Sequence, residues 1–338
     1  MYSVDQIQHV HLEISSRCNA ACPLCPRNLN GYPYNDGYIE HDMTLDQAKI
    51  IFQTAFLQQI KNLLINGNFG DAVMNPATVD IVRYFRSSNP DLKIMMSTNG
   101  GARDREYWQS LAKSDVEIMF CIDGLEDTHH LYRQNTLYQT VMRNAEIFIA
   151  AGGRAIWKMI KFDHNTHQIK QAQLLSQQKG FAQFRLIDHG RNQGPVFDQH
   201  GNLVHVMGQP MIQDFPTILK NRMHSKVLLE DILDNRQPRP INCQVKKQRS
   251  IYVSSTGDVY PCCYLGFDPK TYGHGNDHAA ANAQFRDFVQ QNNALEYNLS
   301  HCIAWFGNIE NTWTIPTFEQ GRLIICNDVC GKAQDPNK

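Results

Sequence analysis

The sequence lacks any hydrophobic run that approaches the roughly 20 residues of a membrane-spanning helix. Its N-terminal stretch lacks a charged segment followed by an apolar one, so no secretory signal peptide is predicted. The 338 residues carry a net charge of −1, which excludes a globally basic protein that binds nucleic-acid backbones. Internal repeats and low-complexity tracts are also missing. We therefore expect a soluble, cytoplasmic protein with no membrane or general nucleic-acid partner.

Cysteine, by contrast, is abundant. Ten cysteines is a high number for a reducing compartment, where clustered thiols indicate metal or redox chemistry more often than disulfides. Cys18, Cys22 and Cys25 follow one another with C-x3-C-x2-C spacing. A structural zinc site needs four ligands, and the nearby His9 and His11 share one face of a predicted strand and need not reach this loop. Three thiolates on a [4Fe–4S] cluster would leave one iron open.

Short apolar runs alternate with helical patterns over the first 190 residues. Strands are predicted at 10–15, 62–66, 93–98, 116–123, 155–162 and 181–188, and helices at 43–59, 78–88, 105–114, 137–153 and 167–180. Thr44 and Gln47 form a predicted capping box at the start of the first helix. This alternation indicates an α/β fold with a parallel sheet, namely a partial (β/α)6 TIM-like barrel.

The chain divides into three predicted segments. Residues 1–190 form the barrel, and residues 191–242 are a polar connector with little core of its own. Residues 243–338 form a small cysteine-bearing module of a β-hairpin and helices. Because reactive groups lie at the carboxyl ends of barrel strands, the three cysteines after the first strand are expected at that face.

The cysteine loop after a first strand, followed by β/α units, resembles the radical S-adenosylmethionine (radical SAM) family. The resemblance implies that Cys18, Cys22 and Cys25 bind a [4Fe–4S] cluster whose open iron chelates SAM. An electron from the cluster would cleave SAM to methionine and a 5′-deoxyadenosyl radical, which takes hydrogen from a substrate.

The same resemblance assigns SAM contacts at strand ends. Gly70 and Asp71 stand in the place of a family turn that meets the SAM amino group, with Asp71 replacing a glutamate; a plain strand-to-helix turn is the alternative. The "STNG" turn, with Ser97, Thr98 and Asn99, matches a turn near the ribose and methionine moieties.

After the fourth strand, Asp123 and Gly124 match a family Ser-Ile-Asp-Gly pattern, with Cys121 in the serine place. Arg133 would pair with the SAM carboxylate, because guanidinium binds carboxylates bidentately; a surface helix arginine is the alternative. Cys121 is expected to be a small buried strand residue. The two loop histidines, His129 and His130, are expected to be solvated.

Hydrophobic residues are expected to form a wall against the adenine of SAM. Leu24 holds a position that is often aromatic in the family. Ile160 or Met159 on the fifth strand and Leu186 on the sixth are the further candidates, and each can also be ordinary core.

A second set of cysteines begins at Cys243, where C-x13-G-x4-C spacing joins Cys243, Gly257 and Cys262 across a predicted hairpin. This resembles the opening of the SPASM and Twitch modules of radical SAM enzymes, which hold auxiliary [4Fe–4S] clusters. The resemblance implies one auxiliary cluster, and its ligands are expected to be Cys243, Cys262, Cys326 and Cys330, with Cys302 in reserve. Cys263 points the other way on a regular strand. A zinc site is the alternative.

The expected function is therefore hydrogen abstraction by a radical SAM enzyme that oxidises or modifies a small molecule or a peptide. A ribosomal peptide or protein maturase is one alternative, and a non-catalytic iron–sulfur or zinc protein is another. A flavodoxin or ferredoxin is expected as the electron donor. The catalytic residues that face the substrate are not predicted.

Overall fold

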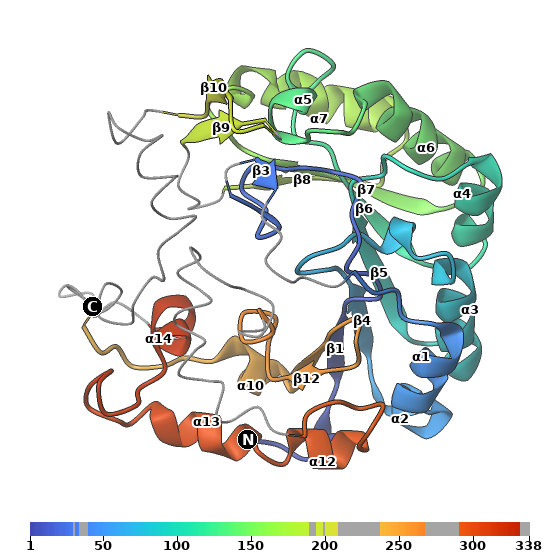
Figure 1. Cartoon of the computed structure of the whole chain (residues 1–338). Coiled ribbons are helices and arrows are strands. Elements are labelled where there is room, and N and C mark those ends of the chain that lie inside the picture. Colours follow the sequence, from blue (N-terminus) through green and yellow to red (C-terminus); the bar gives the residue numbers. More distant parts are fainter. Residues whose placement is uncertain are drawn as a thin grey trace.

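The protein is described here from a computed structural model that covers residues 1–29, 31–33, 40–188, 194–198, 200–208, 237–267 and 291–331. No helix among these residues has the length and apolar character needed to cross a membrane. Figure 1 shows a curved sheet with helices on its outer, convex side.

The sheet has eight strands in the order β12-β11-β1-β4-β5-β6-β7-β8. Six of them are the predicted barrel strands: β1 His9–Leu12, β4 Asn62–Ile65, β5 Lys93–Thr98, β6 Glu117–Cys121, β7 Arg154–Ile160 and β8 Gln183–Ile187. Neighbouring members of this set pair in parallel, as expected for β/α units. The α/β fold and the partial barrel are therefore confirmed.

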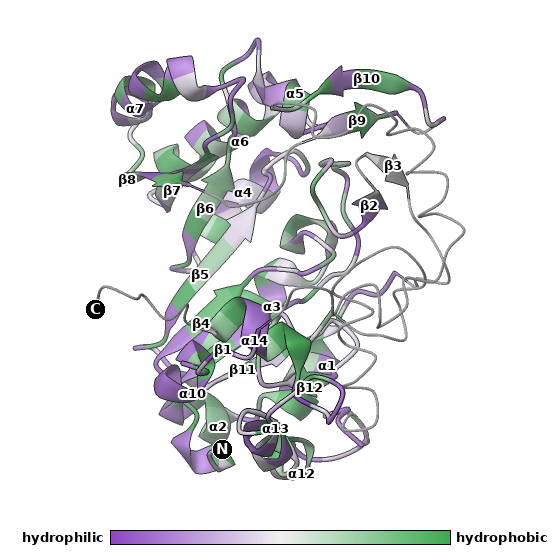
Figure 2. Cartoon of the chain, turned by 90° about the vertical axis from the view of Figure 1, so that its left-hand side faces the viewer, coloured by the Kyte–Doolittle hydropathy of each residue, from purple (hydrophilic) through white to green (hydrophobic). Residues whose placement is uncertain are grey.

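The helices lie outside the strands and bury an apolar face against them. They are α1 Leu45–Ile51, α2 Thr54–Gln59, α3 Thr78–Ser88, α4 Arg105–Ala112, α6 Tyr138–Ala150 and α7 Ile169–Gln178. Figure 2 shows hydrophobic residues along β4 to β7 and hydrophilic ones over α7. The α3 helix has the predicted bounds, and Ile81, Val82 and Phe85 are its fully buried apolar side chains.

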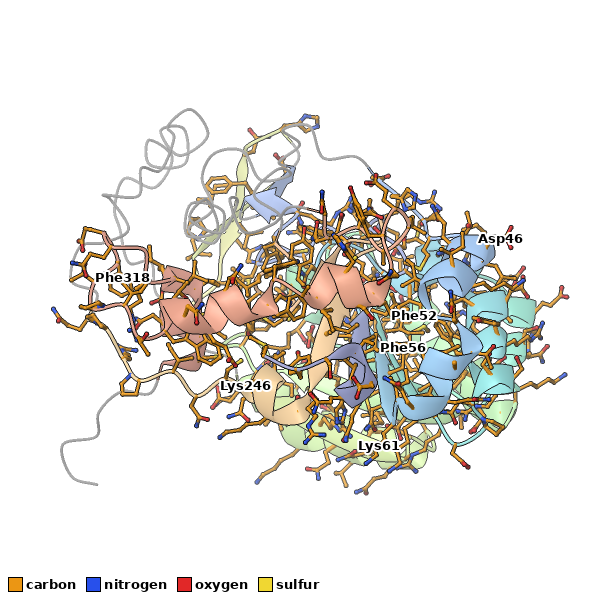
Figure 3. All side chains as sticks on the ribbon, turned by 90° about the horizontal axis from the view of Figure 1, so that it is seen from below. Asp46, Phe52, Phe56, Lys61, Lys246 and Phe318 are labelled. Atoms are coloured by element: carbon orange, nitrogen blue, oxygen red, sulfur yellow. The ribbon has the colours of Figure 1, made fainter. Side chains whose placement is uncertain are left out.

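The prediction of one helix over 43–59 was wrong, because two helices, α1 and α2, occupy this stretch. The capping box is confirmed: the Thr44 side chain accepts from the Gln47 N–H, and the Gln47 side chain accepts from the Thr44 N–H. The break falls at Phe52, whose backbone leaves the helical region with φ −108° and ψ 70°. Its fully buried ring meets Phe85 edge-on and lies near Phe56, so core packing overrides helical continuity (Figure 3).

The C-terminal segment joins the barrel sheet directly. Strand β11 Ser250–Val253 pairs in parallel with β1 and antiparallel with β12 Val259–Tyr260, so the predicted hairpin is present. Gly257 takes the positive φ of +90° that its turn requires. The helices at this end of the sheet are α10 Gln244–Gln248, α12 Leu299–Ile303, α13 Phe306–Thr312 and α14 Ile324–Cys330.

Short elements complete the described part of the chain. They are η1 Val4–Gln6, β2 Asn28–Leu29, β3 Tyr32–Pro33, η2 Ala72–Met74, α5 His129–Tyr132, η3 Thr166–Gln168, β9 Pro195–Phe197 and β10 Leu203–Val206. The β9–β10 hairpin contributes Val196 and Met207 to a small buried cluster with Cys22. Most of the predicted connector lies outside the described residues.

Candidate active site

The three loop cysteines lie just beyond the carboxyl end of β1. A turn between Cys22 and Cys25 is closed by a backbone hydrogen bond of 3.0 Å, and the Ala21 N–H donates to the Gln134 carbonyl at 3.0 Å. The loop is thus anchored to the segment after β6. Burial raises the pKa of the Cys18 thiol, and burial also raises the pKa of Cys22 to about 11. Without a cation or metal, these thiols stay protonated near neutral pH.

Nitrogen donors point at two of these sulfur atoms. The Ala20 N–H lies 3.4 Å and Asn99 Nδ2 lies 3.7 Å from Cys18 Sγ. Arg133 Nη1 lies 3.6 Å from Cys22 Sγ, and its charge partly offsets the effect of burial on the pKa of that thiol. Such donors stabilise thiolates that carry a metal cluster.

Asp71 connects the ends of β4 and β5. One carboxylate oxygen accepts from Thr98 Oγ1 at 2.7 Å and from the Val73 N–H at 3.1 Å, and the other accepts from the Asn99 N–H at 2.6 Å. Burial raises the pKa of Asp71. The carboxylate therefore organises the strand ends in this structure, and its contact with a SAM amino group stays a prediction.

The neighbouring Gly70 allows two loops to touch. A Cβ atom at this position would lie 2.0 Å from the Ser15 carbonyl oxygen. Because Ser15 precedes the cysteine loop, the missing side chain brings the turn after β4 against the chain that carries the cysteines.

Asp123 and Arg133 form a buried ion pair. Arg133 Nε donates to Asp123 Oδ2 at 2.6 Å, and Asp123 Oδ1 accepts from the Ile160 N–H at 2.5 Å. Asp123 is fully buried, whereas the Arg133 side chain keeps 14% of its surface exposed. The two predicted residues are thus brought together beside Cys22, and Arg133 is not a surface arginine.

The remaining predicted contacts separate into two groups. Leu24 and Ile160 share the small buried cluster with Cys22. Leu186 is 42% exposed on the outermost strand, and Met159 packs in the main core on the helix side, so neither joins that cluster. Ser97 is buried, and its hydroxyl lies 3.3 Å from the thiol of Cys121, which is the expected small buried strand residue.

The loop histidines differ from the expectation of two solvated side chains. His130 is exposed, but His129 is 1% exposed and lies with Nε2 3.2 Å from Thr136 Oγ1. Burial, aided by the Arg133 charge, lowers the pKa of His129 to about 4. The prediction was wrong for His129 because it begins α5, which folds back over the barrel.

Glu13 is a site residue that the sequence reading missed. It is 1% exposed, and its Oε1 accepts from the N–H groups of Phe69 and Gly70 at 2.8 and 2.9 Å. Its Oε2 accepts from the Tyr252 hydroxyl at 2.7 Å, and burial raises the pKa of the carboxyl. The sequence does contain a signal for this residue, because Glu13 is a charged residue within the apolar strand "VHLEIS".

The four preferred cysteines of the second set line one partly open cavity of about 180 Å³. These are Cys243, Cys262, Cys326 and Cys330, and Cys243 and Cys330 are within hydrogen-bonding distance. Cys302 is fully buried in the main core and does not line this cavity. Cys263 is also absent from the lining.

Protein N–H groups lie beside each of these four thiols. They are the backbone groups of Val245 and Lys246 beside Cys243, that of Leu265 beside Cys262 and that of Gln244 beside Cys330, and the indole of Trp313 beside Cys326. Among the described residues, no three Cys, His, Asp or Glu side chains converge on a point that one metal ion could occupy. A cubane cluster binds each thiolate at a different iron, so its ligands need not converge in that way.

Comparison with known protein families matches residues 12–164 to a model described as the radical SAM superfamily. This stretch contains the cysteine loop, Asp71, Asn99 and the Asp123–Arg133 pair. The chain belongs to the radical SAM superfamily. It is a radical SAM enzyme, and membership implies a [4Fe–4S] cluster and SAM as cofactors. The loop thiols and their N–H donors fit such a cluster.

Solved radical SAM structures share the fold over most of the chain. SuiB of Streptococcus suis, bound to S-adenosylmethionine, aligns with a TM-score of 0.55 at 12% identity and covers 95% of this chain and 77% of its own. Native anSMEcpe with bound AdoMet aligns with a TM-score of 0.51 at 15% identity, covering 87% and 82%. At this identity the likeness concerns the fold.

Two curated relatives have names that refer to a cofactor. A tungsten-containing aldehyde ferredoxin oxidoreductase cofactor-modifying protein of Pyrococcus furiosus is 20% identical over 92% of this chain and 86% of its own length. The FeMo cofactor biosynthesis protein NifB of Azotobacter vinelandii is 28% identical over 42% of this chain. This chain spans about a third of NifB, since 32% of that protein is covered.

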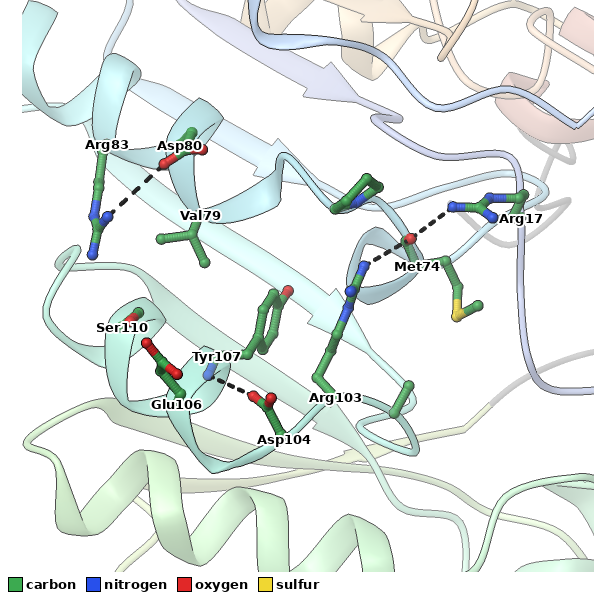
Figure 4. A pocket seen from close by; sticks show the side chains of 12 residues that line it. Arg17, Met74, Val79, Asp80, Arg83, Arg103, Asp104, Glu106, Tyr107 and Ser110 are labelled. Carbon is green, nitrogen blue, oxygen red and sulfur yellow. Dashed lines mark hydrogen bonds and ion pairs between the residues drawn. The ribbon is translucent and has the colours of Figure 1, made fainter.

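A separate cleft of about 790 Å³ lies between α3 and α4 on the outer side of the radical SAM barrel (Figure 4). Arg17 and Arg103 reach into it from two sides and both donate to the Met74 carbonyl, at 2.9 and 2.8 Å. These bonds hold η2, which follows Asp71. The cleft has no cysteine in its lining, and its arginines support the loop after β4.

Proposed function

We propose that this radical SAM enzyme cleaves SAM reductively and abstracts hydrogen from a small-molecule substrate. The observation that carries the proposal is the convergence of Cys18, Cys22, Asn99 and the Asp123–Arg133 pair beyond the ends of the parallel strands. The [4Fe–4S] cluster, when bound to the three loop cysteines, supplies the electron for cleavage and one iron site that SAM can chelate.

Arg133 would bind the carboxylate of SAM. Its Nε is held by Asp123, which fixes the plane of the guanidinium, while Nη1 faces Cys22. A planar guanidinium can engage a second carboxylate with its remaining N–H groups. Leu24 and Ile160, packed around Cys22, would give an apolar surface for the adenine and exclude water.

The four C-terminal thiols are proposed to hold one auxiliary [4Fe–4S] cluster. Their shared cavity supports a common metal site, and the absence, among the described residues, of three such side chains around one ion position favours a cluster over a zinc ion. That cluster would accept the electron that remains after a two-electron oxidation, or would orient the substrate. A flavodoxin or ferredoxin would supply electrons to the barrel cluster.

The small-molecule class is favoured by the curated relative that spans nearly the whole chain. Its name describes a protein that modifies a cofactor. A peptide is the competing class, and the assay below separates the two.

The test uses anaerobically purified protein reconstituted with iron and sulfide. About eight irons per chain, as two [4Fe–4S] clusters require, with 5′-deoxyadenosine formed from SAM and dithionite, would support the proposal. Zinc in place of iron would overturn it. Deuterated small-molecule extracts and deuterated peptide pools would then be compared for transfer of deuterium into 5′-deoxyadenosine, which identifies the substrate class.

A further inference from the structure

The cavity lined by the four C-terminal cysteines also contains an indole. Trp313, the residue directly after α13, lines it together with Cys326. Its Nε1 is buried and has no hydrogen-bond partner in the described part of the chain. A buried N–H group without an acceptor costs about 1–3 kcal/mol, so its presence in an otherwise apolar cavity calls for an acceptor.

The acceptors that this cavity offers the indole are sulfur atoms. Its lining contains the thiols of Cys243, Cys262, Cys326 and Cys330, and its exposed surface is otherwise almost wholly apolar. Backbone N–H groups lie beside Cys243, Cys262 and Cys330. The N–H group beside Cys326 belongs to a side chain, which a substitution can remove.

The position of Trp313 is held from several directions. The backbone N–H of Trp313 donates to the Glu310 carbonyl at 3.0 Å, and the backbone carbonyl of Trp313 accepts from Arg322 Nη1 at 2.6 Å. Lys246 Nζ lies 5.8 Å from the ring centroid and is paired with Glu310 at 2.6 Å. The indole is therefore held by backbone hydrogen bonds and by a charge contact to its ring.

We infer that Trp313 is a positioning residue for the auxiliary cluster, and that its indole N–H donates to the Cys326 sulfur and raises the reduction potential of that cluster. The inference rests on the proposed auxiliary cluster. A hydrogen bond to a cluster sulfur stabilises the reduced, more negative state more than the oxidised state. Removal of the donor should therefore make the cluster harder to reduce.

The experiment compares three proteins that all carry Cys18→Ala, Cys22→Ala and Cys25→Ala, so that signals come from the C-terminal thiols alone. The first has no further change, the second adds Trp313→Phe, and the third adds Trp305→Phe. Trp305 packs against the same small hydrophobic cluster but does not line the cavity, which makes it a matched control. Each is reconstituted and titrated with dithionite while the reduced cluster is followed by electron paramagnetic resonance.

We expect Trp313→Phe to keep its iron and to shift the midpoint potential downward, while Trp305→Phe matches the parent. An unchanged potential in Trp313→Phe with full iron content would overturn the inference and leave the auxiliary cluster intact. If the parent holds no iron, the auxiliary cluster itself is wrong, and the inference falls with it.

A measurement on the wild-type chain covers the case in which Trp313→Phe loses its cluster. The protein is labelled with tryptophan that carries 15N in the indole ring; the chain has four tryptophans. Pulsed electron paramagnetic resonance should detect a 15N coupling to the auxiliary cluster, which Trp305→Phe retains. A cluster signal without any 15N coupling would refute the hydrogen bond.

Discussion

Glu13 and Tyr252 share a hydrogen bond of 2.7 Å although 239 positions separate them in the chain. The carboxylate that accepts this bond also holds the backbone of Phe69 and Gly70. One buried side chain thus connects the end of β1, the loop after β4 and the C-terminal hairpin. A change at this residue should affect all three.

Glu13→Gln should lower the free energy of unfolding by about 1–3 kcal/mol, because the amide can no longer accept from the two N–H groups and the hydroxyl together. Anaerobic thermal unfolding of the reconstituted protein measures the loss. Tyr252→Phe removes a single donor and should cost less. Equal melting temperatures for Glu13→Gln and wild type would contradict the role assigned to Glu13.

Asp123→Asn should destabilise the protein strongly and reduce SAM binding. The substitution leaves the Arg133 guanidinium beside a neutral group, and breaking a buried ion pair costs about 3–5 kcal/mol. Asp115→Asn is the matched control, because Asp115 is 84% exposed in its pair with Arg86 and such pairs contribute little. Similar melting temperatures for the two variants would show that the buried pair is dispensable.

Gly70→Ala should reduce both iron retention and SAM cleavage. The new Cβ would need space now held by the Ser15 carbonyl, so the turn must move away from the cysteine loop. Gly307→Ala tests whether any added methyl group is harmful. Its nearest neighbour would be 3.7 Å away, and alanine is favoured over glycine in a helix by about 0.5–1 kcal/mol. A Gly70→Ala protein with normal iron content would contradict the steric argument.

Alanine variants of the two cysteine groups should have different consequences. Loss of Cys18, Cys22 or Cys25 should abolish formation of 5′-deoxyadenosine, since each is expected to bind the cluster that cleaves SAM. Loss of Cys243 or Cys262 should lower iron content towards about four per chain and spare cleavage that is uncoupled from substrate. Cys302→Ala, in the main core, should leave iron content unchanged. SAM cleavage by any loop variant would refute the assignment.

The stability of the protein should fall as the pH decreases from 7 to 5, in part because of His129. Its folded pKa of about 4 lies below the ordinary 6.5, so the unfolded chain takes up the proton first and unfolding becomes more favourable in this window. His129→Gln should show a smaller decrease. The raised pKa values of Glu13 and Asp71 act in the opposite direction, and they do so equally in wild type and in His129→Gln. The difference in the pH dependence of stability between these two proteins therefore reports on His129 alone. Parallel profiles of unfolding free energy against pH for wild type and His129→Gln would contradict the lowered pKa of His129.

The sequence pattern predicts the parallel strands and the helix at 78–88 because each has a clear hydrophobic period and clear ends. It also singles out the cysteines that the structure gathers in one cavity. Long-range side-chain contacts are harder to foresee. The break at Phe52 depends on the ring of Phe85, and the burial of His129 depends on how α5 folds over the barrel.

The contacts of the charged site residues are equally hard to predict from the sequence. Asp71 and Asp123 could be placed at strand ends, but not their protein partners Thr98 and Ile160. Leu186 follows the hydrophobic alternation of an inner strand, yet β8 ends the sheet and leaves it exposed. Position in the sheet order, which local sequence does not encode, decides these cases.

The parallel pairing of β11 with β1 has a consequence for synthesis of the chain. On the ribosome, β1 emerges first and pairs with β4, but its other edge has no partner until Ser250–Val253 have been made. Contacts between such distant segments close slowly, and an open strand edge can meanwhile attract other chains. The loop that carries Cys18, Cys22 and Cys25 begins just beyond this strand. The first cysteine group is therefore translated early and the second late. The sheet next to both groups is completed only when β11 pairs with β1.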